Sequence, residues 1–522
     1  MPTGPRSISD HPAGHEMRTR STLGIVAGES DVSVTTDRPH ERLLIGGEWV
    51  EGGDGGYEIV NPATEVAVGV APEASVQQAH DAARAAREAF ESWSQTTPEQ
   101  RAELLSAAAV RVREKLEDLV PLVISETGCT TAVGRAMQVP VAASRFDRYA
   151  RGALEPNVIP LAPQEMPATP MAPAGLMGAL ARRAPVGVVA CITPYNFPIV
   201  NMAGKIGPAL AMGNTVIVRP APQDPLAVIE LVRILEEVGF PPGVVNVVTG
   251  SSSATGEALV ESPDVDMISF TGSTAVGLRI AEAGGRTMKR LLLELGGKGA
   301  GIVLDDADLA TAVTAIGSVW TFHAGQICTA PTRAIVHRSR YQEFVEGLAK
   351  MATLLPVGDP TDPKTVVGPL ITGAHRERVE GYIRAGADEG AEVVTGGGRP
   401  SHLDRGFYVE PTLLAEVRGD MRVAREEIFG PVIVVETFDD DEEAIHLAND
   451  SDFGLYDYVF TGDSARGMRV ARRLQAGNIG INTIQRNHET PFGGTKLSGV
   501  GRDGGSFGLH AYSELQSVVW PG

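Results

Sequence analysis

The chain has 522 residues, of which 43% are hydrophobic and 21% charged, a composition typical of a globular enzyme and not of a disordered or membrane protein. Its length predicts two large domains of roughly 200 residues each, with smaller elements beside them. The formal net charge of −20 argues against nucleic-acid binding, which needs clustered lysine and arginine side chains.

The N-terminal part of the chain predicts a polar tail followed by a hairpin and two helices. Residues 1–40 are rich in proline, serine, threonine, aspartate and arginine, and we expect them to form a disordered tail. Residues 43–50 predict a β-hairpin. Ser75 and Gln78 form a capping box for a first helix, and Thr97 is a cap for a second.

Residues 160–185 interrupt this succession of predicted elements, because they are rich in proline, methionine, alanine and glycine. They predict either a linker or an excursion away from the main body. Short β-branched runs then alternate with helix-length segments, a pattern that predicts βαβ units and a parallel, doubly wound sheet. These runs are residues 186–192, 215–218, 244–248, 265–270 and 291–293.

From residue 300 the alternation of strands and helices resumes, which predicts a second α/β domain. The expected strands of this domain are residues 301–304, 333–336, 431–435 and 458–461. In a parallel sheet, ligands bind at the carboxyl ends of the strands, so the loops that follow the strands are the places to look for chemistry.

The three cysteines, Cys129, Cys191 and Cys328, are too few for a disulfide framework, and no Cys/His spacing suggests a metal site. Residues 1–20 lack the apolar run of a signal peptide. The apolar stretches elsewhere are far shorter than the ~20 residues that cross a bilayer. We therefore expect a cytoplasmic protein without bound metal, nucleic acid or membrane.

Three loops in the first α/β region have unusual local sequences. In residues 193–198, two prolines bracket Asn196, which suits a rigid amide that donates to an oxyanion, although a plain turn would look similar. Residues 270–277 open a helix directly after a strand, where backbone N–H groups and the helix dipole favour a pyrophosphate. Glu294 is flanked by leucines before two glycines, and burial would raise its pKa toward that of a general base.

Three further loops lie in the C-terminal half. Residues 325–330 contain Cys328, which by itself could be only a small hydrophobic residue. Residues 426–431 place a carboxylate and an aromatic ring in one turn. Residues 491–502 contain two glycine-rich turns.

Together and in this order, these six segments resemble the aldehyde dehydrogenase superfamily, from about residue 41 to the C-terminus. The resemblance implies an α/β fold with a Rossmann-like, doubly wound cofactor domain, a second α/β catalytic domain and a small β oligomerisation element. The boundaries that follow are 41–160 and 186–296 for the dinucleotide-binding domain, 297–495 for the catalytic domain, and 161–185 with 496–522 for the oligomerisation element.

The resemblance also implies oxidation of an aldehyde to a carboxylic acid with NAD(P). Cys328 would attack the carbonyl carbon, and the Asn196 amide with the Cys328 backbone N–H would hold the oxyanion. After hydride transfer, Glu294 would activate water against the thioester. Lys205 matches an active-site lysine. Acyl transfer to coenzyme A is an alternative that Glu294 disfavours, and a non-catalytic relative would not need these residues.

For the cofactor, the resemblance implies that Ser273 and Gly272 contact the pyrophosphate, that Glu427 binds the nicotinamide ribose and that Phe429 packs behind the ring. Further contacts are expected from Thr193, Pro194, Tyr195, Gly250 and Leu295.

The adenosine end departs from the family pattern. Relatives usually carry a lysine after the second strand and a glutamate three residues later, where this chain has Arg219 and Pro222. Arg219 can donate to ribose oxygens or to a 2′-phosphate, and the missing carboxylate removes a barrier to that phosphate. We expect NAD, with NADP possible.

Tyr195, Phe197, Phe322 and Phe492 are expected to line an aromatic substrate tunnel. The polar segment 485–489 at its mouth is either a solvated loop or a recognition element for a distal polar group. Semialdehyde-specific relatives tend to carry an arginine just before the lysine at 205, where this chain has Gly204. That difference disfavours succinate semialdehyde and favours aromatic or medium-chain aldehydes.

Residues 509–520 alternate as a strand does, and with residues 160–185 they match the family's oligomerisation element. We therefore expect a homodimer or homotetramer.

Overall fold

The structure, a computed structural model, describes residues 41–522. The expected disordered tail, residues 1–40, lies outside the described residues. Among residues 41–522, no helix has both the length and the apolar character needed to cross a bilayer.

The first elements of the described chain form as the sequence predicts. A hairpin comes first, and both predicted caps begin helices: Ser75 and Gln78 form a reciprocal capping box, and so do Thr97 and Gln100. The elements of this part are β1 (Leu43–Ile45), β2 (Glu48–Val50), β3 (Gly56–Val60), β4 (Ala67–Pro72), α1 (Val76–Trp93), α2 (Pro98–Glu114), α3 (Leu116–Thr127), α4 (Thr131–Val133), the π-helical η1 (Gly134–Gln138) and α5 (Val139–Ala153).

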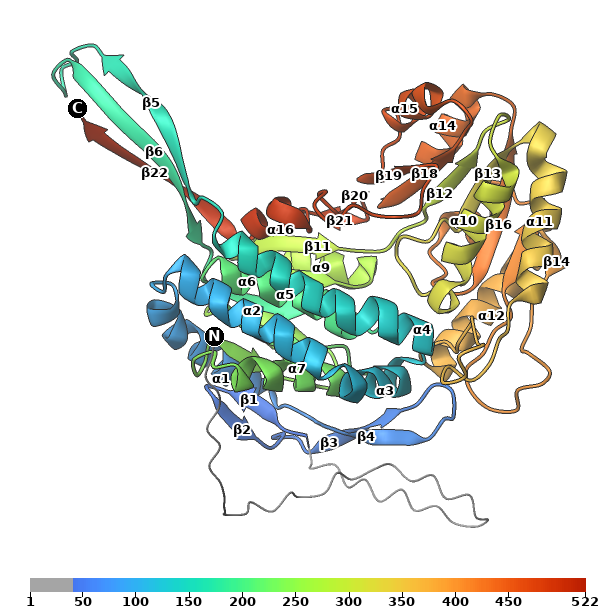
Figure 1. The fold of residues 1–522 in the computed structure, drawn as a ribbon, viewed down its shortest axis with the longest axis horizontal. Helices are drawn as coiled ribbons and strands as arrows, with labels where there is room; N and C mark the ends of the chain where they lie inside the picture. Colours follow the sequence, from blue (N-terminus) through green and yellow to red (C-terminus); the bar gives the residue numbers. More distant parts are fainter. Residues whose placement is uncertain (1–40) are drawn as a thin grey trace, which may run out of the picture. The chain divides into compact units, whose positions relative to one another are not determined.

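An eight-stranded sheet has the order β2-β1-β9-β8-β7-β10-β11-β21, and its strands from β9 to β11 are parallel (Figure 1). The chain steps from β7 to β9 in one direction and then places β10 on the other side of β7. The switch point of the sheet therefore lies between β7 and β10. The strands and helices of this part are β7 (Val188–Ile192), α6 (Pro198–Ala211), β8 (Thr215–Arg219), α7 (Leu226–Glu237), β9 (Val245–Val247), α8 (Ala254–Glu261), β10 (Met267–Thr271), α9 (Thr274–Gly285), β11 (Arg290–Glu294) and β21 (Gly499–Val500).

Helices cover both faces of this sheet, which explains the near-continuous apolar strands. Along β7, Val189 and Cys191 pack with buried residues of α2, α5, α6 and α7, whereas Val188 and Ala190 pack with those of α1 and α8. The predicted doubly wound α/β architecture is thus confirmed.

A second, seven-stranded sheet has the order β14-β15-β16-β13-β12-β18-β19, with only β14 antiparallel to its neighbour. The sequence did not predict β14, β15 and β19, which are four residues each. The elements of this part are β12 (Ala300–Val303), α10 (Leu309–Thr321), the 3₁₀ turn η2 (Phe322–Gly325), β13 (Arg333–His337), η3 (Arg338–Arg340), α11 (Tyr341–Leu354), α12 (Gly373–Asp388), β14 (Glu392–Thr395), β15 (Thr412–Ala415), α13 (Arg422–Arg425), β16 (Val432–Phe438), α14 (Asp441–Asn449), β17 (Phe453–Gly454), β18 (Tyr456–Phe460), α15 (Ser464–Ala471), β19 (Asn478–Ile481) and β20 (Thr495–Lys496).

A three-stranded antiparallel sheet stands apart from the two large sheets (Figure 1). It consists of β5 (Val158–Met166), β6 (Gly175–Pro185) and β22 (Ser513–Pro521). Residues 160–185 are therefore no linker, because most of them form a hairpin whose inner strand pairs with the C-terminal strand. The strand β21 pairs with β11 in the large sheet, so the segment from residue 496 contributes to two sheets, and α16 (Gly505–Ala511) lies between them.

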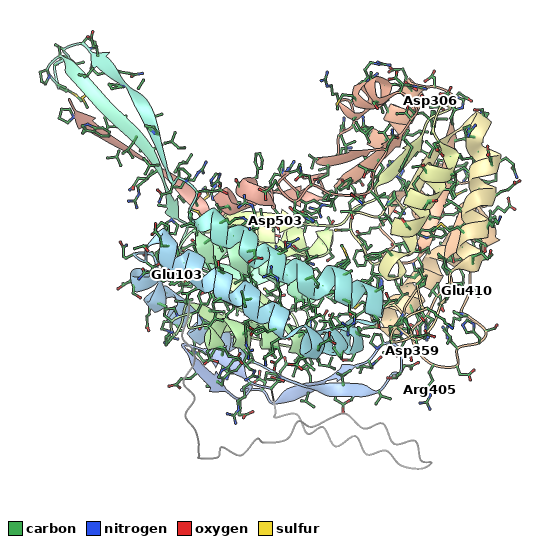
Figure 2. All side chains as sticks on the ribbon, viewed as in Figure 1. Glu103, Asp306, Asp359, Arg405, Glu410 and Asp503 are labelled. Atoms are coloured by element: carbon green, nitrogen blue, oxygen red, sulfur yellow. The ribbon has the colours of Figure 1, made fainter. Side chains whose placement is uncertain are left out.

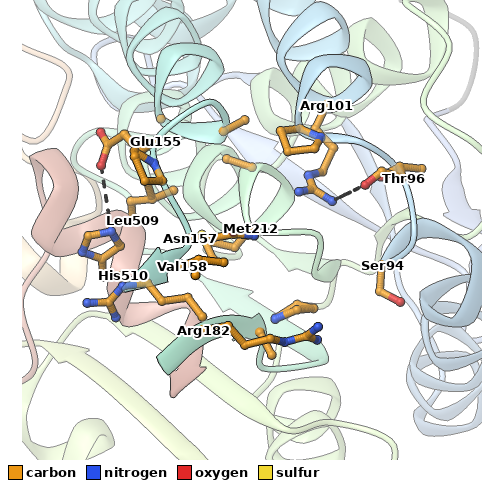
Figure 3. Close-up of a pocket in the computed structure, with 18 of the residues that line it drawn as sticks. Ser94, Thr96, Arg101, Glu155, Asn157, Val158, Arg182, Met212, Leu509 and His510 are labelled. Atoms are coloured by element: carbon orange, nitrogen blue, oxygen red, sulfur yellow. Dashed lines mark hydrogen bonds and ion pairs between the residues drawn. The ribbon is translucent and has the colours of Figure 1, made fainter. Parts of the chain in front are cut away.

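A cavity of about 490 Å³ lies at the base of this small sheet, where β5 and β6 meet the ends of α1, α5 and α6 (Figure 3). Arg101 donates to the Thr96 carbonyl on one side, and His510 faces Glu155 at 3.9 Å on the other. None of the predicted catalytic or cofactor residues lines the cavity, so the chemistry must lie elsewhere.

Candidate active site

The predicted catalytic loops meet where glycines allow close approach. A Cβ atom on Gly297 would lie 2.5 Å from the carbonyl oxygen of Cys328, and one on Gly493 would lie 2.6 Å from Oε1 of Glu294. A Cβ atom on Gly296 would overlap the Glu427 carboxylate. The structure therefore brings Cys328, Glu294 and Glu427 together around the Gly296-Gly297 turn.

The loop that carries Cys328 is held by a buried glutamine. The Gln326 side chain donates to the carbonyls of His323 (3.1 Å) and Pro369 (3.4 Å) and accepts from the Ile371 N–H (3.0 Å). His323 and Ala324 have positive φ angles of 50° and 53°, which non-glycine residues rarely adopt. No sequence motif predicted this strained turn, which sets the direction in which the chain reaches Cys328.

Asn196 is 4% exposed and lies beside the same loop. Its Nδ2 donates to the Gln326 carbonyl at 2.8 Å, and its Oδ1 accepts from the Phe197 N–H at 3.0 Å. An amide nitrogen carries two N–H donors, so one remains for an oxyanion formed at Cys328.

The environment of Cys328 favours the neutral thiol in the ligand-free protein. Burial raises the pKa of the thiol to about 12, and the Glu427 and Glu294 carboxylates act in the same direction. Arg486 lowers it. Since the thiolate is the nucleophile, the thiol must lose its proton during attack, and hydrolysis of the resulting thioester needs a base.

Glu294, the last residue of β11, fits that need. It is 4% exposed, and within residues 41–522 neither of its carboxylate oxygens has a hydrogen-bond partner. Burial raises its pKa well above the ordinary value, and the Asp503 carboxylate adds to the effect, while Lys205 opposes it. Asp503, labelled in Figure 2, lies between β21 and α16. Such a carboxylate accepts a proton readily.

Lys205 lies on α6 and is 1% exposed. Its Nζ donates to Ser269 Oγ at 3.1 Å, and Ser269 shares a 2.7 Å hydrogen bond with Tyr512. Burial lowers its pKa, against the Asp503 and Glu294 carboxylates. The ammonium group is thus anchored on β10, and its assignment as a catalytic residue stays a prediction.

The switch point of the eight-stranded sheet presents an open helix end. Ser273 caps α9, accepting from the Val276 N–H at 3.4 Å, and it is exposed. Gly272 donates its N–H to the Glu294 carbonyl at 3.0 Å, so the turn before the helix is tied to the catalytic strand. Thr193, at the neighbouring strand end, has a buried hydroxyl without a hydrogen-bond partner among the described residues. This arrangement fits a pyrophosphate.

Arg219 is held by the backbone. Its guanidinium donates to the carbonyls of Pro220 (3.0 Å), Gly250 (3.2 Å) and Ser252 (2.6 Å). The group therefore joins the loops after β8 and β9, beside the partly buried Pro222. Most of its donors are satisfied inside the protein and are not free for a phosphate.

Glu427 accepts from the Gly297 N–H at 2.8 Å, which fixes it against the catalytic turn. Next to it, Phe429 has a φ of 61°, and its ring meets Tyr195 edge to face at 6.0 Å between centroids. His375 contacts the Phe429 carbonyl at 2.7 Å, and Arg378 donates to the Glu427 carbonyl at 2.7 Å. Sequence reasoning missed His375 and Arg378, because no local motif connects them to residues so distant in the chain.

A charged side chain lies among the aromatic residues that were expected to line the substrate tunnel. Phe197 and Phe322 stack at 6.4 Å between ring centroids. The guanidinium of Arg486 lies 3.7 Å from the centroid of the Phe492 ring. Sequence reasoning singled out residues 485–489 as polar but did not identify Arg486 as the member that turns inward.

Comparison with known proteins agrees with this geometry. Residues 49–518 match the sequence profile of the aldehyde dehydrogenase family. The chain belongs to the aldehyde dehydrogenase family. Members of this family oxidise aldehydes to acids, and the two-domain α/β fold is the family's fold.

Three relatives show how similar the chain is to known members of the family. It is 38% identical to the 3-succinoylsemialdehyde-pyridine dehydrogenase of a Pseudomonas species, over 92% of this chain and 99% of that one. The NAD⁺ complex of an aldehyde dehydrogenase from Bacillus cereus has 38% identity and a TM-score of 0.87, over 92% and 97% of the two chains. The NAD⁺ complex of betaine aldehyde dehydrogenase from Staphylococcus aureus has 35% identity and a TM-score of 0.88, over 92% and 94%.

Proposed function

We propose that this chain oxidises its aldehyde through a covalent intermediate on Cys328 and that Glu294 activates the water that hydrolyses it. The observation that carries the proposal is the meeting of a half-buried thiol, a buried carboxylate without hydrogen-bond partners among residues 41–522 and a held amide at one turn. A buried carboxylate without partners is costly unless it has a task, and together the three groups supply a nucleophile, a base and an oxyanion donor.

In the first step, the Cys328 sulfur bonds to the carbonyl carbon while its proton passes through water to the solvent. The carbonyl oxygen becomes an oxyanion, which the free N–H of Asn196 and the Cys328 backbone N–H stabilise. NAD, when bound, supplies the acceptor for the hydride that leaves this carbon. The product of oxidation is a thioester on Cys328.

In the second step, water attacks the thioester and gives its proton to Glu294. The carbon–sulfur bond then breaks and releases the carboxylic acid. Glu294 returns the proton to the departing Cys328 thiolate, which restores both groups. Because burial raises the pKa of Glu294 well above that of an exposed glutamate, the group suits a role in which it takes and returns a proton.

The residues present fit NAD. Ser273 and Gly272 at the start of α9 would hold the pyrophosphate, Glu427 the nicotinamide ribose, and Phe429 with Tyr195 the ring. Two similar structures are NAD⁺ complexes. We favour NAD over NADP, since the donors of Arg219 that could bind a 2′-phosphate are largely engaged with backbone carbonyls.

We also propose a homodimer or homotetramer in the cytoplasm. All nine residues of β5 are exposed, and so are apolar residues of β22 such as Val519 and Trp520. A second copy that pairs with this sheet would cover them. The free state of all three cysteines agrees with a reducing compartment. A monomeric mass by light scattering would contradict the oligomer.

The mechanism is tested by trapping the acyl-enzyme. Glu294→Gln, mixed with NAD and an aldehyde and quenched with acid, is expected to carry the acyl group on the Cys328 peptide in mass spectra. Glu436→Gln is a matched control, because Glu436 is also 4% exposed with two unpartnered oxygens but lies on β16. That variant should turn over without accumulating the adduct. An acyl group on another residue would overturn the proposal.

A further inference from the structure

We propose that the substrate is an aldehyde with a carboxylate at its far end, which Arg145 and Arg486 bind. The inference rests on the proposed function, because it concerns the same site. It names the substrate class, which neither the family nor the proposed mechanism determines.

Arg486 lies in the loop between β19 and β20, on the wall of the site. Its guanidinium covers the Phe492 ring at 3.7 Å, and Phe492 packs against the same hydrophobic cluster as Cys328. Tyr456 and Tyr458, stacked at 4.6 Å between ring centroids, belong to that cluster. Burial raises the pKa of the Cys328 thiol, and the Arg486 guanidinium is near enough to oppose that shift.

Arg145 reaches the same place from α5. A Cβ atom on Gly204 would overlap Nη1 of Arg145, so the guanidinium lies directly against α6, one residue before Lys205. Burial lowers the pKa of Arg486, and the Arg145 charge adds to that shift. Burial also lowers the pKa of His488, and both guanidinium charges act in the same direction. Two guanidinium groups and a histidine therefore converge on one place, although they repel each other.

Among residues 41–522, no carboxylate forms an ion pair with either guanidinium, although the Glu294 carboxylate interacts electrostatically with Arg486. Within residues 41–522, neither Arg145 nor Arg486 makes a hydrogen bond or an ion pair. The nearby Glu489 is bound by Arg148 at 2.6 Å, and Glu294 is required as the base. Two unpaired, partly buried cations beside a nucleophile, in a chain whose net charge is −20, are unfavourable unless an anion completes the site.

A carboxylate is the anion that this arrangement suits, because guanidinium groups bind carboxylates through paired, charge-assisted hydrogen bonds. The Phe492 ring beneath Arg486 supports the guanidinium plane and leaves its edge for the ligand. A cationic substrate such as betaine aldehyde would be repelled. This proposal departs from the sequence-based expectation, which disfavoured succinate semialdehyde because of Gly204. In the structure, Gly204 provides the room that the Arg145 guanidinium occupies.

The first experiment compares matched aldehydes with the full-length enzyme and NAD. The carboxylates are 5-oxopentanoate and 4-carboxybenzaldehyde, the neutral partners are pentanal and the methyl ester of 4-carboxybenzaldehyde, and the cation is betaine aldehyde. We expect kcat/KM to be at least tenfold higher for each carboxylate than for its neutral partner, and lowest for the cation. Equal or better use of the neutral aldehydes overturns this inference but leaves the proposed function intact. If no aldehyde at all is oxidised, the proposed function fails and the inference fails with it.

The second experiment separates recognition from general support of the site. Arg145→Gln and Arg486→Gln should each raise KM for 5-oxopentanoate at least tenfold, and the loss of kcat/KM for 5-oxopentanoate should exceed that for pentanal at least tenfold. Arg486→Lys should restore part of the carboxylate preference. Arg338→Gln, which removes an exposed ion pair with Asp439, is the control and should change neither substrate. If the arginine variants slow pentanal as much as 5-oxopentanoate while their melting temperatures stay normal, the arginines act on the thiol or the loop and the proposal is wrong.

Discussion

The two large sheets contribute to the site from opposite ends of their strands. In the eight-stranded sheet, functional residues follow the strands: Asn196 comes after β7, Ser273 after β10, and Glu294 ends β11. In the seven-stranded sheet they precede the strands, with Cys328 before β13 and Glu427 before β16.

This difference explains how each side holds its groups. Carboxyl-terminal loops of a parallel sheet lead into helices, whose N-termini attract anions without special side chains. The opposite edge offers no such helix ends, and there the chain uses a strained turn at His323 and Ala324 together with the buried Gln326. The first sheet therefore offers binding through regular structure, whereas the second positions reacting groups through locked irregular loops.

The largest loss of activity is expected when the nucleophile is removed from the irregular loop before β13. Cys328→Ala is expected to lower kcat by about 10⁴-fold or more, because no other group can form the thioester. NAD(P)H formation with a saturating aldehyde measures the loss. Cys129→Ala, which removes a buried thiol from the core beside the first sheet, is the matched control and should stay active. Near-normal activity in Cys328→Ala would refute the covalent mechanism.

The next largest loss of activity is expected for Glu294, which ends a regular strand of the eight-stranded sheet. Glu294→Gln should lower steady-state turnover by about 10²–10⁴-fold, the usual contribution of a general base. Rapid mixing should still show the first turnover if deacylation is the step that needs the carboxylate. A loss of the first turnover as well would show that Glu294 also takes the thiol proton.

Glu294 also predicts a pH dependence. Its pKa is raised, and only the carboxylate form accepts protons, so turnover should fall as pH decreases through that raised value and hold above it. In Glu294→Gln the residual rate should lose this acid limb. A limb at the ordinary pKa of an exposed glutamate would mean that the burial seen here does not govern catalysis.

How far the sequence could predict these features depends on how local their causes are. The capping box at Ser75 and the strands from β7 to β11 follow from neighbouring residues, and so they were predictable. The order of the six motifs was specific enough to identify Cys328, Asn196 and Glu294 as candidates. The positive φ angles of His323 and Ala324 were not predictable, because contacts with residues some forty positions away, such as Pro369, support them.

Asn196 tests whether the amide acts in the transition state or only holds the loop. Asn196→Ala should lower kcat by about 10²–10³-fold, the usual effect of removing one oxyanion donor. Because the same amide donates to Gln326, the melting temperature has to be followed in parallel. A large drop in stability with an unchanged kcat would assign Asn196 to the structure alone.

The smallest effect is expected for the turn itself. Gly325 has a φ of 71°, and a Cβ atom there would overlap the Gly430 carbonyl. Gly325→Ala should therefore destabilise the protein by about 1–3 kcal/mol, seen as a lower melting temperature. Gly285→Ala, where a Cβ atom would meet nothing within 4 Å, is the control and should be neutral or slightly stabilising. Equal melting temperatures would show that the turn is not under strain.

The contact between Arg145 and Gly204 has a consequence for comparing relatives by alignment. The space beside α6 can be filled by a side chain on α6 or by a side chain that reaches across from α5. The two residues that fill it stand in different columns of a sequence alignment. A glycine at 204 read alone indicates an empty space, whereas the structure shows an occupied one. Substrate groups in this family would therefore be sorted better by the charge present in that volume, summed over both helices, than by the residue type in a single column.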